Sequence, residues 1–209
     1  VAIDGLVTHL HKTFPLLKVK GLQGDYHQFL ANIKLIGEPQ KNVVLFLGSN
    51  IGNYSKTEAS QLLTSLHQGL NSGDQLLIGM DLKKDIQRMT AAYNDQNGVT
   101  KAFNLNLLHR MNDELGANFE LDSFSHYETY NPLDAAMQSF LVSAKTQTIQ
   151  FSAIDLEVEF DAYETIFVES SHKYSLRDVE GLASENGFKV LENFVDDKGD
   201  FVDSLWQRM

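Results

Sequence analysis

The stretch VVLFLGSNIGN, from Val43 to Asn53, decides the fold of this chain. Its first half is wholly apolar, as expected of a short parallel strand that is covered on both faces. Its second half contains two glycines, a serine and two asparagines, with a single isoleucine among them. Ligands of open α/β sheets bind beyond the carboxyl ends of the strands. The stretch therefore predicts either the floor of a binding site or a plain turn.

The residue types of this loop suit a zwitterionic ligand. Gly48 and Gly52 lack a Cβ and so permit close approach to the backbone. The side-chain amides of Asn50 and Asn53 each offer two donors and an acceptor. A free amino acid needs that mixture, because its carboxylate accepts and its ammonium donates. The same residues also suit a turn with positive φ angles, and the loop does not match the common phosphate-binding motifs. The pattern alone leaves both interpretations open.

Strands and helices alternate through the first half of the chain, which predicts right-handed crossover units and a parallel sheet. The apolar spacing and the capping signals place four further elements. The first is a helix at residues 1–14 that Pro15 ends, and the second is a strand at 17–26 that stops at Gly24 and Asp25. The third is a helix that begins at the Ser55–Glu58 capping box and buries Leu62, Leu63, Leu66 and Leu70. The fourth is a buried strand at 75–80.

The pattern changes in the second half. Residues 84–115 have helical spacing interrupted near residues 94–98, and residues 125–170 alternate with period two, which predicts an antiparallel meander. Helix–strand order then returns, and the chain closes with a final antiparallel strand. We therefore predict an α/β fold with a Rossmann-like core and an inserted lobe of helices and antiparallel strands. The predicted parts are residues 1–83 (core), 84–168 (lobe) and 169–209 (core).

Composition excludes several classes of protein. The chain has 209 residues, 43% of them hydrophobic, enough to bury a sizeable core. Its net charge of -11 argues against binding nucleic acid or an anionic membrane. It has no cysteine, which excludes disulfides and thiolate chemistry and favours a cytoplasmic location. The chain begins at Val1 on a predicted helix, so we expect a fragment of a longer protein. The sequence does not indicate an oligomeric state.

Two pairs of residues outside the loop are candidate ligand contacts. Asp25 can accept from an adenine amino group while the Tyr26 ring stacks on the base, although Asp25 would equally cap a helix. Glu169 and Ser171 alternate along one strand and so share a face, where a carboxylate and a hydroxyl suit a ring that bears N–H groups. A solvated strand edge is the alternative for that pair. The histidines lack metal-binding spacing, so no metal is predicted.

Several segments together resemble one family. They are FLGSNIGN, GMDLKKD, AYNDQNGVTKAFNLNLLHRMNDELGANF, LVSAKTQTI and ETIFVESSHKYS. The combination is similar to the histidine-specific S-adenosylmethionine-dependent methyltransferases, typified by the histidine Nα-methyltransferase of ergothioneine biosynthesis. The resemblance extends from about Phe14 to Trp206. It implies methyl transfer from S-adenosylmethionine to the α-amino nitrogen of a small-molecule amino acid.

The resemblance also implies roles for individual residues. Asp25 and Tyr26 would hold the adenine end of the methyl donor, with Gly48 close to it. Asn53 and Tyr93 would position the α-amino-carboxylate for reaction, with Thr100 nearby. The imidazole would lie between three further residues, which are Ser139, Glu169 and Ser171.

The sequence departs from the family pattern in two places. This chain has no counterpart of the family's glycine-rich loop or of the acidic end of its second strand. We expect both segments upstream of Val1. We therefore expect this chain alone to bind S-adenosylmethionine weakly and to be inactive. Calorimetric titration with micromolar affinity would contradict that expectation. Ser139 stands where the family pattern has a methionine, which makes the predicted pocket roomier. An indole amino acid such as a tryptophan derivative, or a non-catalytic binding role, therefore stays open.

Overall fold

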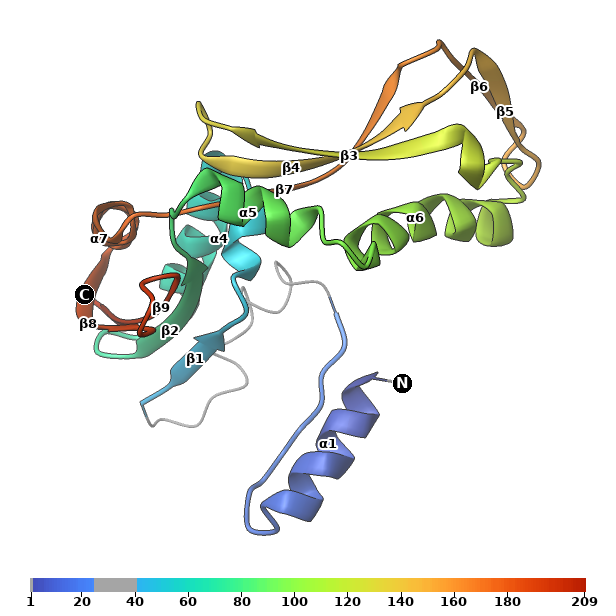
Figure 1. The fold of residues 1–209 in the computed structure, drawn as a ribbon. Coiled ribbons are helices and arrows are strands. Elements are labelled where there is room, and N and C mark those ends of the chain that lie inside the picture. The colour runs from blue at the N-terminus through green and yellow to red at the C-terminus, as the bar shows by residue number, and fades with distance from the viewer. Residues whose placement is uncertain (1, 25–40) are drawn as a thin grey trace.

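A mixed four-stranded sheet forms the core of the computed structural model, which describes residues 2–24 and 41–209. Its strands lie in the order β1 (Val43–Phe46), β2 (Gln75–Asp81), β9 (Phe201–Arg208) and β8 (Phe188–Val195). Strand β1 is parallel to β2, whereas β9 is antiparallel to both β2 and β8. Three strands thus point one way and the last strand of the chain points the other way, as predicted (Figure 1).

Two capped helices pack beside this sheet. Helix α4 (Lys56–Gly69) begins with the predicted capping box, in which the Ser55 hydroxyl accepts from the Glu58 N–H at 3.3 Å and the Glu58 carboxylate accepts from the Ser55 N–H at 2.8 Å. Helix α7 (Leu176–Glu185) has a second capping box. The apolar stripe of α4 is buried as predicted. The largest fully buried side chains of this core include Leu62, Leu63, Leu66, Leu70, Leu76, Ile78, Phe188 and Trp206.

Strand β1 differs from its prediction. It is parallel to β2, but Val43 and Leu45 are 55% and 61% exposed, while Phe46 is buried on the other face. Nothing in the described part of the chain covers the outer face, so the apolar run is not buried on both sides. An apolar run specifies a strand, but burial needs a second packing layer.

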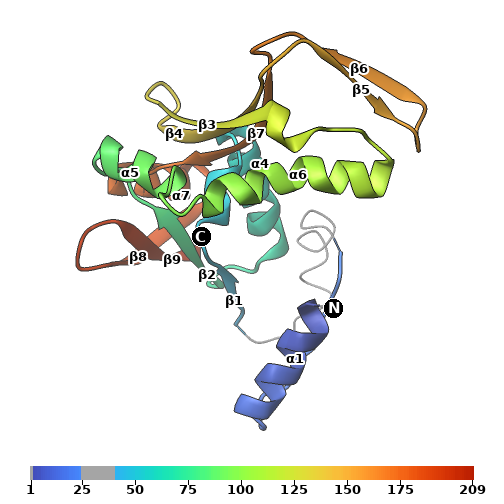
Figure 2. The same ribbon diagram turned by 45° about the vertical axis from the view of Figure 1, so that its right-hand side comes forward.

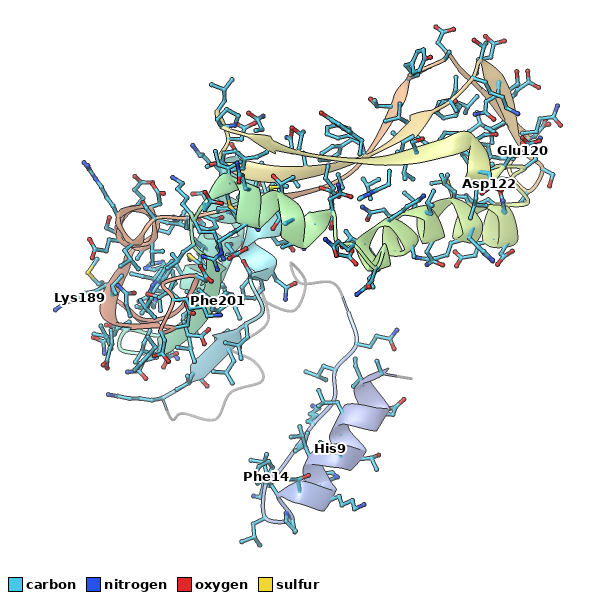
Figure 3. All side chains as sticks on the ribbon, in the orientation of Figure 1. His9, Phe14, Glu120, Asp122, Lys189 and Phe201 are labelled. Atoms are coloured by element: carbon cyan, nitrogen blue, oxygen red, sulfur yellow. The ribbon has the colours of Figure 1, made fainter. Side chains whose placement is uncertain are left out.

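The N-terminal region confirms one expectation and corrects another. Helix α1 (Ala2–Thr13) ends just before Pro15, as predicted, and it buries none of its residues. Residues 17–24 form no strand, since an alternating pattern becomes a strand only where it pairs with a neighbour, and residues 25 and 26 of the predicted strand lie outside the described part of the chain. Figure 3 shows His9 on α1 and Phe14 just after it, both away from the sheet.

A second lobe contains two helices and two small antiparallel sheets. Helices α5 (Ile86–Tyr93) and α6 (Val99–Leu115) precede the short η2 (Leu121–Ser123) and a three-stranded sheet in the order β3 (Phe124–Asn131), β4 (Ala136–Ser143) and β7 (Thr165–His172). Strands β5 (Gln147–Phe151) and β6 (Leu156–Phe160) form a separate hairpin, so the predicted meander is interrupted. Helix α6 runs alongside β3 (Figure 2). A separate apolar core centred on Leu108, Phe119 and Phe124 holds this lobe together.

Strand β7 leads from the lobe back toward the core. It pairs with β4 on one side, and the residue that follows it, Lys173, reaches the end of β2. The predicted boundary between residues 168 and 169 falls within this strand. The fold is therefore α/β, with a Rossmann-like core and an inserted antiparallel lobe. Among the helices of the described residues, none is long and apolar enough to cross a membrane.

Candidate functional site

The loop after β1 contains both a turn and an exposed amide. Gly48 and Ser49 have φ angles of 76° and 57°, in the left-handed region, and the Asn50 amide donates to the Leu47 carbonyl at 2.9 Å. These three residues therefore form a tight turn. Asn53 ends the short helix η1 (Asn50–Asn53) and is exposed, and its amide makes no hydrogen bond within the described ranges. Asn53 is thus the amide of this loop that can serve a ligand.

Close packing fixes η1 against the end of β7. A Cβ on Gly52 would lie 3.0 Å from the His172 carbonyl oxygen, which is closer than ordinary contact, so a larger residue would have to push η1 and β7 apart. The Tyr174 hydroxyl donates to the Ile51 carbonyl at 3.4 Å. Burial, with Asp178 nearby, raises the pKa of Tyr174 to about 12, so this hydroxyl stays protonated and remains a donor. The loop that carries Asn53 is thereby positioned beside the strand that carries Glu169 and Ser171.

Lys173 lies at the centre of the site. It is 3% exposed, and its Nζ lies 2.7 Å from Asp81 Oδ2, 2.7 Å from Tyr93 Oη and 2.9 Å from Ser171 Oγ. Its three contacts come from the end of β2, the end of α5 and β7. A buried ammonium is stable only when it is paired and hydrogen-bonded. Lys173 therefore holds together the core, the lobe and two of the predicted substrate contacts.

Asp81 is the counter-ion of two lysines. Its second oxygen, Oδ1, lies 2.6 Å from Lys84 Nζ, and its backbone N–H donates to the Ser49 hydroxyl at 3.0 Å. Asp81 thus ties the loop after β1 to the carboxyl end of β2. This is the edge of the sheet at which ligands of α/β folds bind.

A row of polar residues crosses the three-stranded sheet. Ser139 on β4 is paired with Glu128 on β3 and with Glu169 on β7, so the three side chains share a face. Glu128 Oε1 lies 2.7 Å from His126 Nε2 and accepts from the Asn104 amide at 3.4 Å. Glu128 Oε2 and the Ser139 hydroxyl are buried without a hydrogen-bond partner among the described residues. The row therefore offers acceptors to a ligand that carries N–H donors.

Glu169 differs electrostatically from an ordinary surface carboxylate. Burial and the negative charge of Glu128 raise its pKa, while the Lys173 ammonium partly offsets that rise. Both the Glu128 carboxylate and the Lys173 ammonium therefore act on the charge of Glu169. A ligand donor placed beside it would gain a charge-assisted hydrogen bond in partly dry surroundings.

Replacing Glu128 with Gln should lower the pKa of Glu169, because the amide removes a negative charge that raises it. The measurement is a carboxyl-carbon NMR titration of Glu169 in both proteins. Glu114→Gln is the control, since that carboxylate is exposed on α6 and paired with Arg110. A Glu169 midpoint that stays the same or rises in Glu128→Gln would show that the two carboxylates do not interact.

The structure brings some of the predicted residues together and not others. Tyr93 and Ser171 share Lys173, and Glu169 pairs across the sheet with Ser139. The backbone N–H of Thr100 donates to Asp95 at 2.9 Å near the start of α6, and its predicted place near the substrate stays a prediction. Asp25 and Tyr26 lie outside the described residues, so their predicted contact with adenine stays a prediction.

Sequence reasoning missed Lys173, Asp81 and Glu128. Two signals pointed toward the first two. Lys173 continues the alternation of Glu169 and Ser171 by one further step, and Asp81 follows an apolar strand at its carboxyl end. Glu128 gave no such signal, because its role depends on which strand pairs with β4.

Comparison with known proteins identifies one family and several relatives that agree with the resemblance in the sequence. The model of the family described as histidine-specific, SAM-dependent methyltransferase matches residues 1–208. The histidine N-alpha-methyltransferase of Mycolicibacterium smegmatis is 36% identical over 92% of this chain and 59% of its own length. That of Mycobacterium tuberculosis is 33% identical over 97% of this chain and 62% of its own length. An L-tryptophan methyltransferase of Psilocybe serbica is 26% identical over 92% of this chain and 52% of its own length. The chain thus spans about three-fifths of the length of the two histidine enzymes.

Proposed function

Because the chain belongs to the family of histidine-specific, SAM-dependent methyltransferases, we propose that the protein methylates the α-amino nitrogen of free L-histidine. The product would be Nα-trimethylhistidine, a step of ergothioneine biosynthesis. The observation that carries the proposal is the Lys173 cluster. It joins Tyr93 and Ser171, which would contact opposite ends of the amino acid, through one buried ammonium.

The residues of the site divide between the two ends of the substrate. The exposed amide of Asn53 and the hydroxyl of Tyr93 hold the α-amino-carboxylate and position it for reaction. Glu169 and Ser171 bind the imidazole, with Ser139 between Glu169 and Glu128 on the same face of the sheet. Four further residues complete the proposed set. The methyl donor would contact Asp25, Tyr26 and Gly48, and the substrate would lie near Thr100.

The loop after β1 fits S-adenosylmethionine as the second substrate. A Cβ on Gly48 would meet only the Asn50 amide, at 3.9 Å, so the backbone of this turn is open to a ligand. It lies at the carboxyl end of a parallel strand, where α/β folds place their ligands. Gly48 would therefore lie against the methyl donor.

The reaction requires an unprotonated amine in line with the sulfonium methyl. The nitrogen lone pair forms the N–C bond, the S–CH₃ bond breaks, and its electron pair stays on sulfur to leave a thioether. An α-amino group has a pKa of about 8, so it first loses a proton. The Lys173 side chain is directed at Asp81, Tyr93 and Ser171, so its contacts hold these groups in place. The protein contributes chiefly by positioning the amine.

A tryptophan derivative is the alternative substrate, because Ser139 is small and leaves room for a larger ring. The polar row favours histidine instead. Glu128 and Glu169 flank Ser139 across the sheet, and buried acceptors disfavour the apolar face of an indole. A non-catalytic binding role would show as ligand binding without methyl transfer.

Mass spectrometry of the natural full-length protein with S-adenosylmethionine and a panel of free amino acids tests this proposal. We expect histidine to gain methyl groups on its α-nitrogen, up to the trimethylated product. Methylation of tryptophan derivatives alone would establish the alternative substrate. Binding of histidine without any methylated product would establish the non-catalytic role.

A further inference from the structure

We propose that Lys173 fixes the hydrogen-bond direction of the Ser171 and Tyr93 hydroxyls, and that the site thereby selects a neutral ring with one N–H donor and one bare nitrogen acceptor. This inference rests on the proposed function and adds the chemical form of the substrate. It makes Lys173 a positioning residue, since it acts through Ser171 and Tyr93.

The Lys173 ammonium uses all of its hydrogen-bond donors. A lysine ammonium has three donors and no acceptor. Lys173 Nζ has three oxygen partners, at 2.7 Å (Asp81), 2.7 Å (Tyr93) and 2.9 Å (Ser171). Each N–H group is therefore committed, and both hydroxyl oxygens act as acceptors toward Lys173.

The hydrogens of the Ser171 and Tyr93 hydroxyls point away from Lys173. A hydroxyl that accepts from an ammonium turns its own hydrogen away from it. Neither Ser171 nor Tyr93 donates to another group among residues 2–24 and 41–209. Both hydroxyls are therefore available as donors to a ligand. Tyr93 would donate to the substrate carboxylate, and Ser171 to an acceptor on the ring.

Ser171 and Glu169 together determine which ring the site binds best. They are two residues apart on β7, and the Glu169 carboxylate can only accept. A ring that accepts from Ser171 and donates to Glu169 satisfies both groups, because the Ser171 hydrogen then has an acceptor while its oxygen accepts from Lys173. Neutral imidazole has one nitrogen of each kind. Imidazolium has two donors, and indole has one donor and no ring acceptor, so each leaves the Ser171 hydrogen without an acceptor on the ring.

The pH dependence of KM tests this selection. Below the imidazole pKa of about 6.5 the neutral fraction falls about tenfold per pH unit, so KM for histidine should rise by that factor. The matched substrate is 1,2,4-triazol-3-ylalanine, whose ring keeps a donor and an acceptor without protonating in this range. The titratable groups around Ser171 and Lys173 are Asp81, Lys84, Tyr93, His126, Glu128, Glu169 and His172. They act on both substrates, so the ratio of the two KM values isolates the substrate ring.

Two variants assign the effect to Lys173. Lys173→Met keeps the length of the side chain and frees the Ser171 hydroxyl to accept, so the KM ratio should become flat with pH. Lys173→Arg keeps donors and should preserve the slope. If Lys173→Met does not fold, Ser171→Ala should give the same flat ratio.

The outcomes separate this inference from the proposed function. A wild-type enzyme that methylates histidine with a KM ratio independent of pH would overturn the selection of a neutral ring but leave the function standing. A sloping ratio that persists in Lys173→Met and in Ser171→Ala would overturn the role of Lys173. Absence of histidine methylation would overturn the proposed function itself.

Discussion

Replacement of Asp81 by Asn is expected to lower the free energy of unfolding by about 3 kcal/mol, because it leaves a buried ammonium without a countercharge. The side chain of Lys173 is 1% exposed, and Asp81 Oδ2 lies 2.7 Å from its Nζ. Asn has the same shape and keeps one acceptor oxygen, so the loss reports the charge. Urea denaturation followed by circular dichroism at pH 7 measures it, with the m-value expected to stay constant.

Two further variants make the Asp81 result interpretable. Glu114→Gln breaks the Arg110–Glu114 pair, whose side chains are about 60% exposed, and should lower the free energy of unfolding far less than Asp81→Asn does. Adding Lys173→Met to Asp81→Asn removes both charges, so the double variant should be more stable than Asp81→Asn alone. A loss below about 1 kcal/mol in Asp81→Asn would mean that Lys173 does not depend on Asp81 for its charge.

Elements that depend on local signals could be predicted from the sequence. The Ser55–Glu58 capping box and the apolar stripe after it specify α4, because caps and helical spacing involve residues a few positions apart. The final strand could be predicted as antiparallel because a tight turn precedes it. Strand β1 shows the limit of such signals. Its run of apolar residues defines a strand, but the exposure of Val43 and Leu45 depends on what packs over them.

The candidate site depends on contacts that spacing does not encode. Ser171, Tyr93 and Asp81 are far apart along the chain, and only the fold brings them to the Lys173 ammonium. The row of Glu128, Ser139 and Glu169 likewise requires a particular strand order, with β7 rather than β5 beside β4. Residue types and the alternation along β7 could therefore suggest individual residues such as Lys173, but not which side chains meet its ammonium or that Glu128 lies opposite Ser139.

The opening loop shows how backbone geometry separates two interpretations that the sequence left equal. Gly48, Ser49 and Asn50 are explained by the turn, since two of them have positive φ and the third caps the Leu47 carbonyl. Asn53 has no such role, and its exposed amide stays available to a ligand. The stretch is a turn in its first part and a candidate binding floor in its last residue.

Replacement of Glu169 by Ala should raise KM for histidine at least tenfold and lower kcat much less. A hydrogen bond to a charged group contributes about 1.5–3 kcal/mol, which corresponds to roughly 10- to 150-fold in binding. The loss falls on KM because Glu169 holds the ring, whereas Asn53 and Tyr93 hold the reacting end of the substrate. Steady-state kinetics of the full-length enzyme over a range of histidine concentrations provide both constants.

Glu169→Gln separates the charge of this residue from its hydrogen bond. Gln keeps an acceptor oxygen for the ring N–H but no charge, so its KM should lie between those of the wild type and Glu169→Ala. Glu157→Gln, an exposed position on β6, is the control and should leave both constants unchanged. A KM unchanged in Glu169→Ala would place the imidazole elsewhere. A fall in kcat with constant KM would instead mean that Glu169 acts on the reacting amine, and the two ends of the substrate would then have to be exchanged in the site.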